Sequence, residues 1–345
     1  MITASYHKYI LNFKSPSGTS RGILRTKETW FIILKKDGKI GVGETGLFQG
    51  LSIDDVHDYE EKLKWACKNI ILGLEKLLLK LVEFPSIQFG LEQAFLSLES
   101  KTSFELFPSE FTKGKQSISI NGLVWMGNQQ FMKNQIKEKI ENGFSCIKMK
   151  IGAIDFNTEI ELLKSIRKEF TKSEIELRVD ANGAFEPKNA LEKLKILSDL
   201  EIHSIEQPIR QGQIEEMANL CSKTSLPIAL DEELIGVFSQ DKKQQLIEII
   251  KPQYIILKPS LIGGFSGSKK WIEIANKQSV GWWVTSALES NVGLNAIAQF
   301  THTLQNKMPQ GLGTGSLFTN NFESPLRVKN GTLHYHPTEK WNFNL

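Results

Sequence analysis

Hydrophobic and polar positions divide the chain into two parts with different periods. In the first part, the run 29–35 is rich in aromatic and β-branched residues, and Asp37-Gly38 after it is typical of a two-residue hairpin turn. The stretch 15–25, which contains proline and glycines, predicts a mobile loop before that hairpin. Over 53–100, leucines recur at steps of three and four residues, which predicts helices.

From about residue 116 onward, short β-branched runs alternate with amphipathic segments of helical period. The strand-like runs are 117–121, 146–151, 176–181, 204–207, 228–231, 255–259, 282–286 and 311–314. The helical segments between them include 158–170, 188–197, 213–222, 241–250 and 267–276. Such alternation predicts a parallel sheet with right-handed crossovers. Eight strands whose ends recur about every 25 to 30 residues favour a TIM-type barrel, although an open doubly wound sheet would give the same alternation.

Composition narrows the range of partners. The 42 Lys and Arg residues nearly balance the 39 Asp and Glu residues and are interspersed with them, so nothing indicates binding to nucleic acid or to an anionic membrane. No apolar run approaches the roughly 20 residues that span a bilayer, and the N-terminus lacks the apolar core of a secretory signal. Cys67, Cys146 and Cys221 lie among apolar residues, which predicts buried free thiols and a reducing, cytoplasmic compartment. The sequence does not predict an oligomeric state.

Five charged residues end five successive strand-like runs: Lys150, Asp180, Glu206, Asp231 and Lys258. Because the carboxyl ends of barrel strands form one mouth, we expect these side chains to converge there. Three carboxylates from neighbouring strands would repel one another unless a cation lies among them, and Mg²⁺ prefers oxygen ligands. The three acids are therefore the predicted ligands of Mg²⁺, with Mn²⁺ as an alternative.

The basic residues near these strand ends have complementary roles. Lys148 and Lys150 share one face of a strand, and Lys258 lies about half a barrel away. Cationic neighbours and a metal ion would lower the pKa of a lysine and make neutral amine available as a base. Arg178 alternates in phase with Asp180, which leaves two interpretations: it binds a substrate carboxylate, or it closes the barrel floor by pairing with an acid.

Polar groups at the last two strands complete the predicted site. The glycine-rich stretch 311–316 would offer the backbone N–H groups of Gly313 and Thr314 to a carboxylate, and Ser286 would add a hydroxyl. The alternative, for the glycine-rich stretch and for Ser286, is that they only form the turn and bind no ligand. The predicted substrate-binding residues are Lys148, Arg178, Ser286, Gly313 and Thr314.

These motifs together resemble the enolase superfamily, in particular its muconate-lactonizing branch. The matching segments are Lys148-Met149-Lys150, Asp180-Ala181-Asn182-Gly183-Ala184-Phe185, Glu206-Gln207-Pro208, Asp231-Glu232 and Lys258-Pro259. The resemblance implies an α/β fold with a modified TIM barrel of (β/α)7β type over 116–317. It also implies an α+β capping domain formed by 1–115 with the tail 318–345. Superfamily enzymes use a Lys or His base with Mg²⁺, so Lys150 and Lys258 would flank a small carboxylate substrate.

Several activities of that branch remain open. o-Succinylbenzoate synthase activity is a Mg²⁺-dependent syn dehydration in menaquinone biosynthesis, which converts 2-succinyl-6-hydroxy-2,4-cyclohexadiene-1-carboxylate to 2-succinylbenzoate. In that reaction Lys150 would remove the α-proton, Mg²⁺ would hold the enediolate and Lys258 would stay protonated. Dipeptide epimerases of the branch carry Asp-x-Asp where this chain has Gly313-Thr314-Gly315, which favours the synthase. Dipeptide epimerase, N-acyl amino acid racemase and muconate-type cycloisomerase activities are the alternatives, and a non-catalytic carboxylate-binding barrel is the other class.

Overall fold

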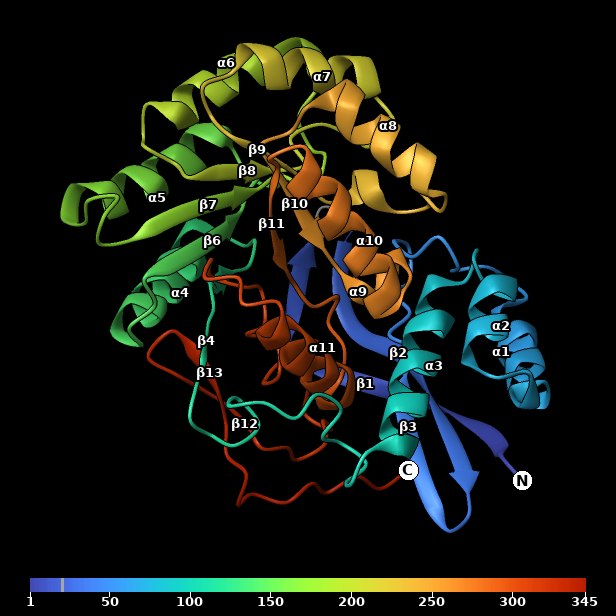
Figure 1. Ribbon diagram of the computed structural model, residues 1–345. Coiled ribbons are helices and arrows are strands. Elements are labelled where there is room, and N and C mark those ends of the chain that lie inside the picture. The colour runs from blue at the N-terminus through green and yellow to red at the C-terminus, as the bar shows by residue number, and fades with distance from the viewer. Residues whose placement is uncertain (20–21) are drawn as a thin grey trace.

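The computed structural model describes residues 1–19 and 22–345. Its N-terminal part is an antiparallel sheet of three strands in the order β1-β2-β3, with helices beside it (Figure 1). The strands are β1 (Thr3–Thr19), β2 (Gly22–Lys36) and β3 (Lys39–Glu44). The helices are α1 (Tyr59–Lys68), η1 (Ile70–Leu72), α2 (Leu74–Lys80) and α3 (Pro85–Glu99).

The hairpin between β2 and β3 is confirmed. Asp37 and Gly38 have φ angles of 49° and 79°, as a type I′ turn requires. The prediction of a loop over 15–25 is wrong outside residues 20–21, which lie outside the described part of the chain. There β1 and β2 continue their pairing through Gly18 and Ile23 after a shift of register that spans Pro16. A proline is accommodated at such an irregularity of an edge strand because it has no N–H to donate.

A parallel sheet of seven strands forms the second part, with helices outside it (Figure 1). Its strands are β5 (Gly122–Val124), β6 (Cys146–Lys150), β7 (Glu176–Asp180), β8 (Ser204–Glu206), β9 (Ile228–Leu230), β10 (Tyr254–Leu257) and β11 (Gly281–Val284). The connecting helices are α4 (Gln129–Glu141), α5 (Phe156–Glu169), α6 (Pro187–Ser198), α7 (Ile214–Lys223), η2 (Glu232–Leu234), α8 (Gln240–Ile250), α9 (Pro259–Ile262), α10 (Gly264–Lys277) and α11 (Asn291–Thr303). Every predicted helix of this part is present; α4 and α11 were not predicted.

Two residues close the sheet into a barrel. Gln310 pairs in parallel with Ile120, and Gly311 pairs in parallel with Thr285 after the end of β11. The prediction of a modified (β/α)7β barrel with a separate α+β cap is confirmed, and the open doubly wound alternative is excluded. Of the predicted last strand, 311–314, only Gly311 pairs with a barrel strand, and Gln310 just before it makes the other pairing.

The predicted first barrel strand, 117–121, is wrong in detail because the chain changes sheets there. Residues Ile118–Ser119 form β4, which pairs with the C-terminal strand β13 (Thr332–Tyr335), and the barrel strand β5 begins only at Gly122. The third sheet has the order β12-β13-β4, with β12 at Leu326–Lys329.

The C-terminal tail also packs on the first sheet. Phe322 and Phe343 lie against Phe31 of β2, with ring centroids 5.3 and 5.4 Å from it. This contact agrees with a tail that belongs to the cap. The bounds 1–115, 116–317 and 318–345 themselves stay a prediction.

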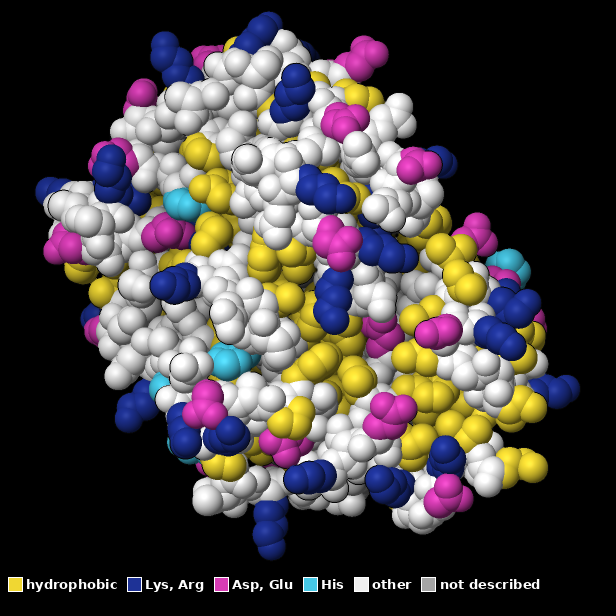
Figure 2. All heavy atoms as spheres, viewed as in Figure 1, with side chains coloured by type: hydrophobic (Ala, Val, Ile, Leu, Met, Phe, Trp, Pro, Cys, Tyr) yellow, Lys and Arg dark blue, Asp and Glu magenta, His cyan; other side chains and the backbone are white. Residues whose placement is uncertain are grey.

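Alternation along the barrel strands decides which side chains reach the interior. In β6, Ile147 and Met149 pack into the main hydrophobic core, whereas Lys148 between them points the other way. Cys67, Cys146 and Cys221 are buried free thiols, as predicted. On the face shown in Figure 2, basic and acidic side chains are interspersed. Within the described residues, no helix has the length and apolar character needed to cross a membrane.

A buried carboxyl group orders the loop that follows β6. Glu159 of α5 is 1% exposed and accepts a hydrogen bond of 2.7 Å from the backbone N–H of Gly152. Burial raises the pKa of this carboxyl from 4.5 to about 7, although hydrogen bonds from the loop backbone oppose the shift. The loop begins directly after the strand that carries Lys150, so its order fixes one side of the barrel mouth.

We expect Glu159→Gln to change how stability depends on pH. The folded state binds this proton more tightly than the unfolded chain, so the free energy of unfolding falls as pH rises from about 4.5 to about 7. Between pH 5 and pH 8 the free energy of unfolding of the wild type should fall by on the order of 2 kcal/mol more than that of Glu159→Gln. Urea unfolding of both proteins at the two pH values measures this difference, and parallel pH curves would contradict it.

Candidate active site

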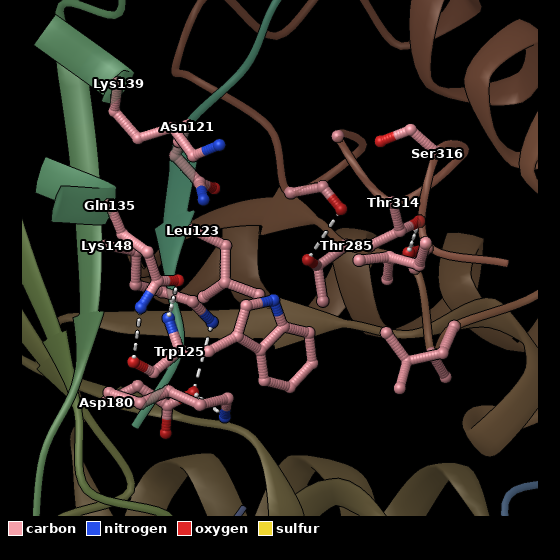
Figure 3. Close-up of a pocket in the computed structure, with 18 of the residues that line it drawn as sticks. Asn121, Leu123, Trp125, Gln135, Lys139, Lys148, Asp180, Thr285, Thr314 and Ser316 are labelled. Atoms are coloured by element: carbon pink, nitrogen blue, oxygen red, sulfur yellow. Dashed lines mark hydrogen bonds and ion pairs between the residues drawn. The ribbon is translucent and has the colours of Figure 1, made fainter. Parts of the chain in front are cut away.

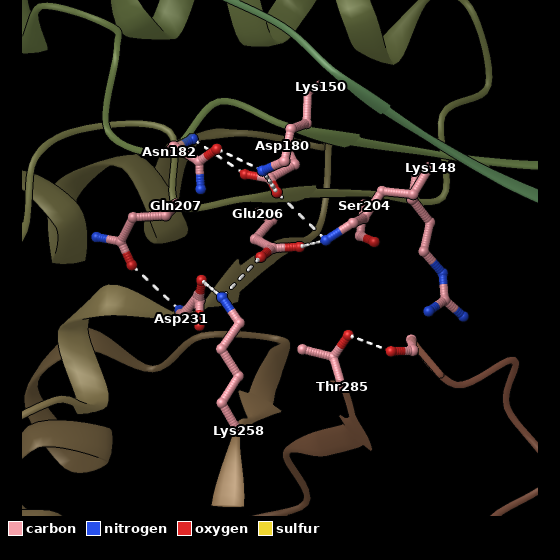
Figure 4. A network of polar contacts seen from close by, with 12 residues as sticks. Lys148, Lys150, Asp180, Asn182, Ser204, Glu206, Gln207, Asp231, Lys258 and Thr285 are labelled. Carbon is pink, nitrogen blue, oxygen red and sulfur yellow. Dashed lines mark hydrogen bonds and ion pairs between the residues drawn. The ribbon is translucent and has the colours of Figure 1, made fainter. Parts of the chain in front are cut away.

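The five charged strand ends meet at one mouth of the barrel (Figure 4). Strand register produces part of this arrangement, since Lys150 pairs with Asp180 and Asp180 pairs with Glu206 across β6, β7 and β8. Asp231 follows β9, and Lys258 follows β10 at the residue just before the short helix α9. All five side chains are at most 12% exposed.

Ammonium groups and carboxylates alternate within this cluster. Lys150 Nζ donates to Asp180 Oδ2 at 2.8 Å. Lys148 Nζ donates to the same oxygen at 3.2 Å and to Glu206 Oε2 at 2.6 Å. Across the mouth, Lys258 donates to Asp231, and its Nζ lies 3.9 Å from Glu206 Oε1. The two strand-end lysines therefore approach the carboxylates from opposite sides, as Figure 4 shows.

These neighbours change the pKa values of the cluster in different directions. Burial alone would raise the pKa of Asp180, but the charges of Lys150 and Lys148 outweigh it and hold that pKa below its usual value. Burial likewise would lower the pKa of Lys148, but the charges of Glu206 and Asp180 hold it above its usual value. The neighbouring carboxylates therefore raise the pKa of Lys148, whereas a lowered lysine pKa was expected from the sequence. The pKa of Asp231 is raised, first by burial and then by neighbouring carboxylates, which Lys258 only partly offsets.

Two amides hold the charged residues in place. Asn182 Oδ1 accepts from Lys150 at 2.6 Å, and the Asn182 backbone N–H donates to Asp180 Oδ1 at 3.0 Å. Gln207 Oε1 accepts from the backbone N–H of Asp231 at 3.1 Å. Sequence reasoning gave these residues no role. The signal that could have found Asn182 is its place two residues after a strand-end acid, since Asn tolerates the left-handed φ of 44° observed there.

Most of the predicted substrate-binding residues line one cavity of about 240 Å³ (Figure 3). Lys148, Ser286, Gly313 and Thr314 all border it, together with the strand-end lysines. Ser286 Oγ and Thr314 Oγ1 share a hydrogen bond of 2.6 Å, so the wall opposite the acids is neutral and polar.

Arg178 is placed differently. Its side chain is buried below the mouth, where Nε donates to Glu176 at 2.7 Å and Nη1 donates to the carbonyl oxygen of Pro309 at 3.0 Å. The guanidinium also lies 4.2 Å from the ring centroid of Trp283. This location favours the interpretation that Arg178 closes the barrel floor over the one in which it binds substrate.

The donors present suit a hard divalent cation. Asp180, Glu206 and Asp231 supply carboxylate oxygens only, and Glu206 Oε1 is buried without a hydrogen-bond partner. Among the described residues, no three His, Cys, Asp or Glu side chains are close enough together to form a ready-made metal cage. Lysine ammonium groups satisfy the carboxylates in this arrangement, so an incoming cation would take over part of their role.

Replacing Arg178 with Met tests its assignment. Loss of the guanidinium leaves Glu176 without its 2.7 Å partner and removes the contact with Trp283, so the free energy of unfolding should fall by roughly 3 kcal/mol. Urea unfolding measures this loss, and KM of the remaining active protein should stay within a few-fold of the wild type. Unchanged stability with a large rise in KM would instead support substrate binding.

Comparison with known proteins assigns the chain to a family. The family described as "Enolase C-terminal domain-like" matches residues 132–339. The o-succinylbenzoate synthase of Desulfotalea psychrophila is 46% identical over 95% of this chain and 98% of its own. The L-Ala-D/L-Glu epimerase of Bacillus subtilis is 26% identical over 64% of this chain and 58% of its own.

The solved structures agree with this assignment. The crystal structure of MenC from D. psychrophila has a TM-score of 0.86 and 43% identity, and the match covers 96% of this chain and 99% of that one. A substrate-liganded complex of the B. subtilis epimerase has a TM-score of 0.81 at 20% identity over 96% and 95% of the two chains, which supports the fold alone. Members of the enolase superfamily depend on a divalent metal, and with these matches over nearly its whole length the chain belongs to that superfamily.

Proposed function

We propose that this enzyme has o-succinylbenzoate synthase activity, the dehydration of 2-succinyl-6-hydroxy-2,4-cyclohexadiene-1-carboxylate to 2-succinylbenzoate. The observation that carries the proposal is the cavity in which Lys150 and Lys258 face each other across three carboxylates, with a neutral wall opposite. The near full-length similarity to a synthase supports the choice among the activities of the superfamily. Similarity to that synthase over nearly the whole chain makes the enzyme a lyase, and we propose a small carboxylate as its substrate.

Lys150 is the proposed base. Asp180 and Asn182 fix its Nζ from one side, which leaves the amine aimed at a substrate carbon rather than free to rotate. It removes the α-proton, and the C–H electron pair enters the adjacent carboxylate as an enediolate. Lys150, now protonated, gives its proton to the hydroxyl on the same face. The enediolate electrons form the new ring C=C bond as the C–O bond breaks, and water leaves.

Lys258 stays protonated on the opposite face. Its hydrogen bond to Asp231 and its 3.9 Å approach to Glu206 hold the ammonium in place. A fixed positive charge beside the substrate carboxylate stabilises the enediolate more than the reactant, because the reactant carries one negative charge fewer there.

The proposed metal ligands are Asp180, Glu206 and Asp231, and Glu206 Oε1 is the oxygen without a protein donor. Mg²⁺ fits this all-carboxylate set, and Mn²⁺ is the alternative. When bound, the ion supplies positive charge that stabilises the second negative charge of the substrate carboxylate. Lys148 contacts both Asp180 and Glu206, so its role is to position these carboxylates.

The neutral wall argues against a substrate with an ammonium group. Ser286 and Thr314 bond to each other at the end of the cavity where the resemblance places an acidic pair in dipeptide epimerases. An ammonium group there would lose its hydration without gaining a counter-charge. The buried free cysteines agree with a reducing, cytoplasmic location for the enzyme.

Turnover of the proposed substrate is the direct test. Purified protein with Mg²⁺ should consume 2-succinyl-6-hydroxy-2,4-cyclohexadiene-1-carboxylate, followed by its loss of absorbance, and EDTA should abolish the reaction until Mg²⁺ is restored. Folded, metal-loaded protein without turnover would refute the assignment. α-Proton exchange in D₂O with dipeptides and N-acyl amino acids would then distinguish an epimerase or racemase.

Replacing Lys150 with Ala tests the base. Removal of the proton acceptor should lower kcat at least 10³-fold, because a positioned base and acid each contribute about 10² to 10⁴. Lys164→Ala, at an exposed lysine paired with Glu161, is the matched control and should retain wild-type kcat. Far- and near-UV circular dichroism confirms that both variants fold, and near-normal turnover by a folded Lys150→Ala would exclude this role.

A further inference from the structure

The barrel has an incomplete seam beside β5. Gln310 and Gly311 pair with Ile120 and Thr285, but no pairing joins residues 122–124 to residues 312–314 in the described backbone. A side chain takes the place of the missing neighbour at the end of β5. Gln135 of α4 accepts from the backbone N–H of Trp125 at 2.9 Å and donates to its carbonyl at 3.0 Å.

The cavity of the candidate active site extends along this seam (Figure 3). Asn121, Leu123 and Trp125 border it on the β5 side, and Gly311 and Gly313 border it on the other. Backbone hydrogen bonds close the barrel at Gly311 but not at Gly313, so the wall is open where the cavity passes. The cavity therefore reaches from the carboxylate cluster to the inner surface of α4.

Lys139 lies at that end of the cavity. Its stem passes over Gly122, where a Cβ atom would come within 3.0 Å of Lys139 Cγ, and its Nζ lies 5.8 Å from the centroid of Phe144. Only 21% of the side chain is exposed. In Figure 3 it extends from α4 toward Asn121.

The charge of Lys139 is weakly compensated by the protein. The other lysines lining the cavity, Lys148, Lys150 and Lys258, donate to buried carboxylates. The acid partner of Lys139 is Glu138 at 3.0 Å, which also borders the cavity but whose side chain is 59% exposed. An ion pair with such an exposed carboxylate is screened by water and contributes little, so a ligand carboxylate can compete for the ammonium group.

We propose that Lys139 binds the terminal carboxylate of the substrate's succinyl chain, with the chain lying along the seam. The identity of the ligand rests on the proposed function, because that substrate carries two carboxylates. The ring carboxylate must lie between Lys150 and Lys258 for the α-proton to be removed. The second carboxylate then extends toward the other end of the cavity, where Lys139 is placed to supply a cation. Lys139 is thus a specificity-determining residue that acts through binding.

The test compares two stable ligands and three variants in the presence of Mg²⁺. 2-Succinylbenzoate carries the terminal carboxylate, and 2-butanoylbenzoate has a chain of the same length without it. Lys139→Met keeps the aliphatic stem over Gly122 but removes the charge, and Lys139→Arg keeps the charge. Lys137→Met is the matched control, since Lys137 is on the same helix, 76% exposed and paired with Glu141.

We expect the wild type to bind the succinyl compound at least tenfold more tightly than the butanoyl compound, as measured by calorimetry. Lys139→Met should lose that preference and raise KM about tenfold with a smaller change in kcat. Lys139→Arg and Lys137→Met should keep the preference.

The outcomes separate this inference from the proposed function. If the wild type turns over the substrate and Lys139→Met still prefers 2-succinylbenzoate to 2-butanoylbenzoate, the role of Lys139 is overturned and the synthase activity is retained. No turnover, with a preference that Lys139→Met abolishes, refutes the synthase activity and retains the carboxylate site. A wild type that binds both compounds equally overturns the role of Lys139 whatever the kinetics.

Discussion

Burial of three carboxylates at neighbouring strand ends is the constraint on which the rest of the site depends. Asp180, Glu206 and Asp231 are each at most 2% exposed, and like charges so placed destabilise a fold unless cations lie between them. The chain meets this requirement with Lys148, Lys150 and Lys258, each from a strand or strand end of the same barrel. In the proposed function, the same alternation of charge places the base Lys150 and the enediolate-stabilising cation Lys258 on opposite faces of the substrate carboxylate. The ion pairs that stabilise the buried carboxylates would therefore also set the geometry of the proposed proton abstraction.

The strands of this barrel, and the charged residues at their ends, could be predicted because both depend on local pattern. Short apolar, β-branched runs end in a charged residue, and the parallel register of β6, β7 and β8 then brings Lys150, Asp180 and Glu206 together. The type I′ hairpin at Asp37-Gly38 could also be predicted from the local sequence, because its two positive φ angles favour such residues.

What the sequence did not predict depends on contacts between distant segments. The continuation of β1 past Pro16 is decided by its pairing with β2, and the switch of 117–121 between two sheets is decided by the C-terminal strand β13. Arg178 left two interpretations because its partners, Glu176 and the carbonyl of Pro309, identify the barrel floor only in three dimensions. Lys139 gave no signal either, since a lysine on an amphipathic helix is ordinarily a solvated residue.

The packing of the C-terminal tail on the first sheet has a consequence for biosynthesis. Phe343, two residues from the end of the chain, lies against Phe31 of β2, and β13 pairs with β4 just before the barrel begins. Domains generally fold as units during synthesis, with N-terminal segments first. Here the first sheet cannot acquire its full aromatic cluster until Phe322 and Phe343 have been synthesised and have reached Phe31. A chain truncated before Phe322 would lack both rings and leave Phe31 more exposed to chaperones and proteases.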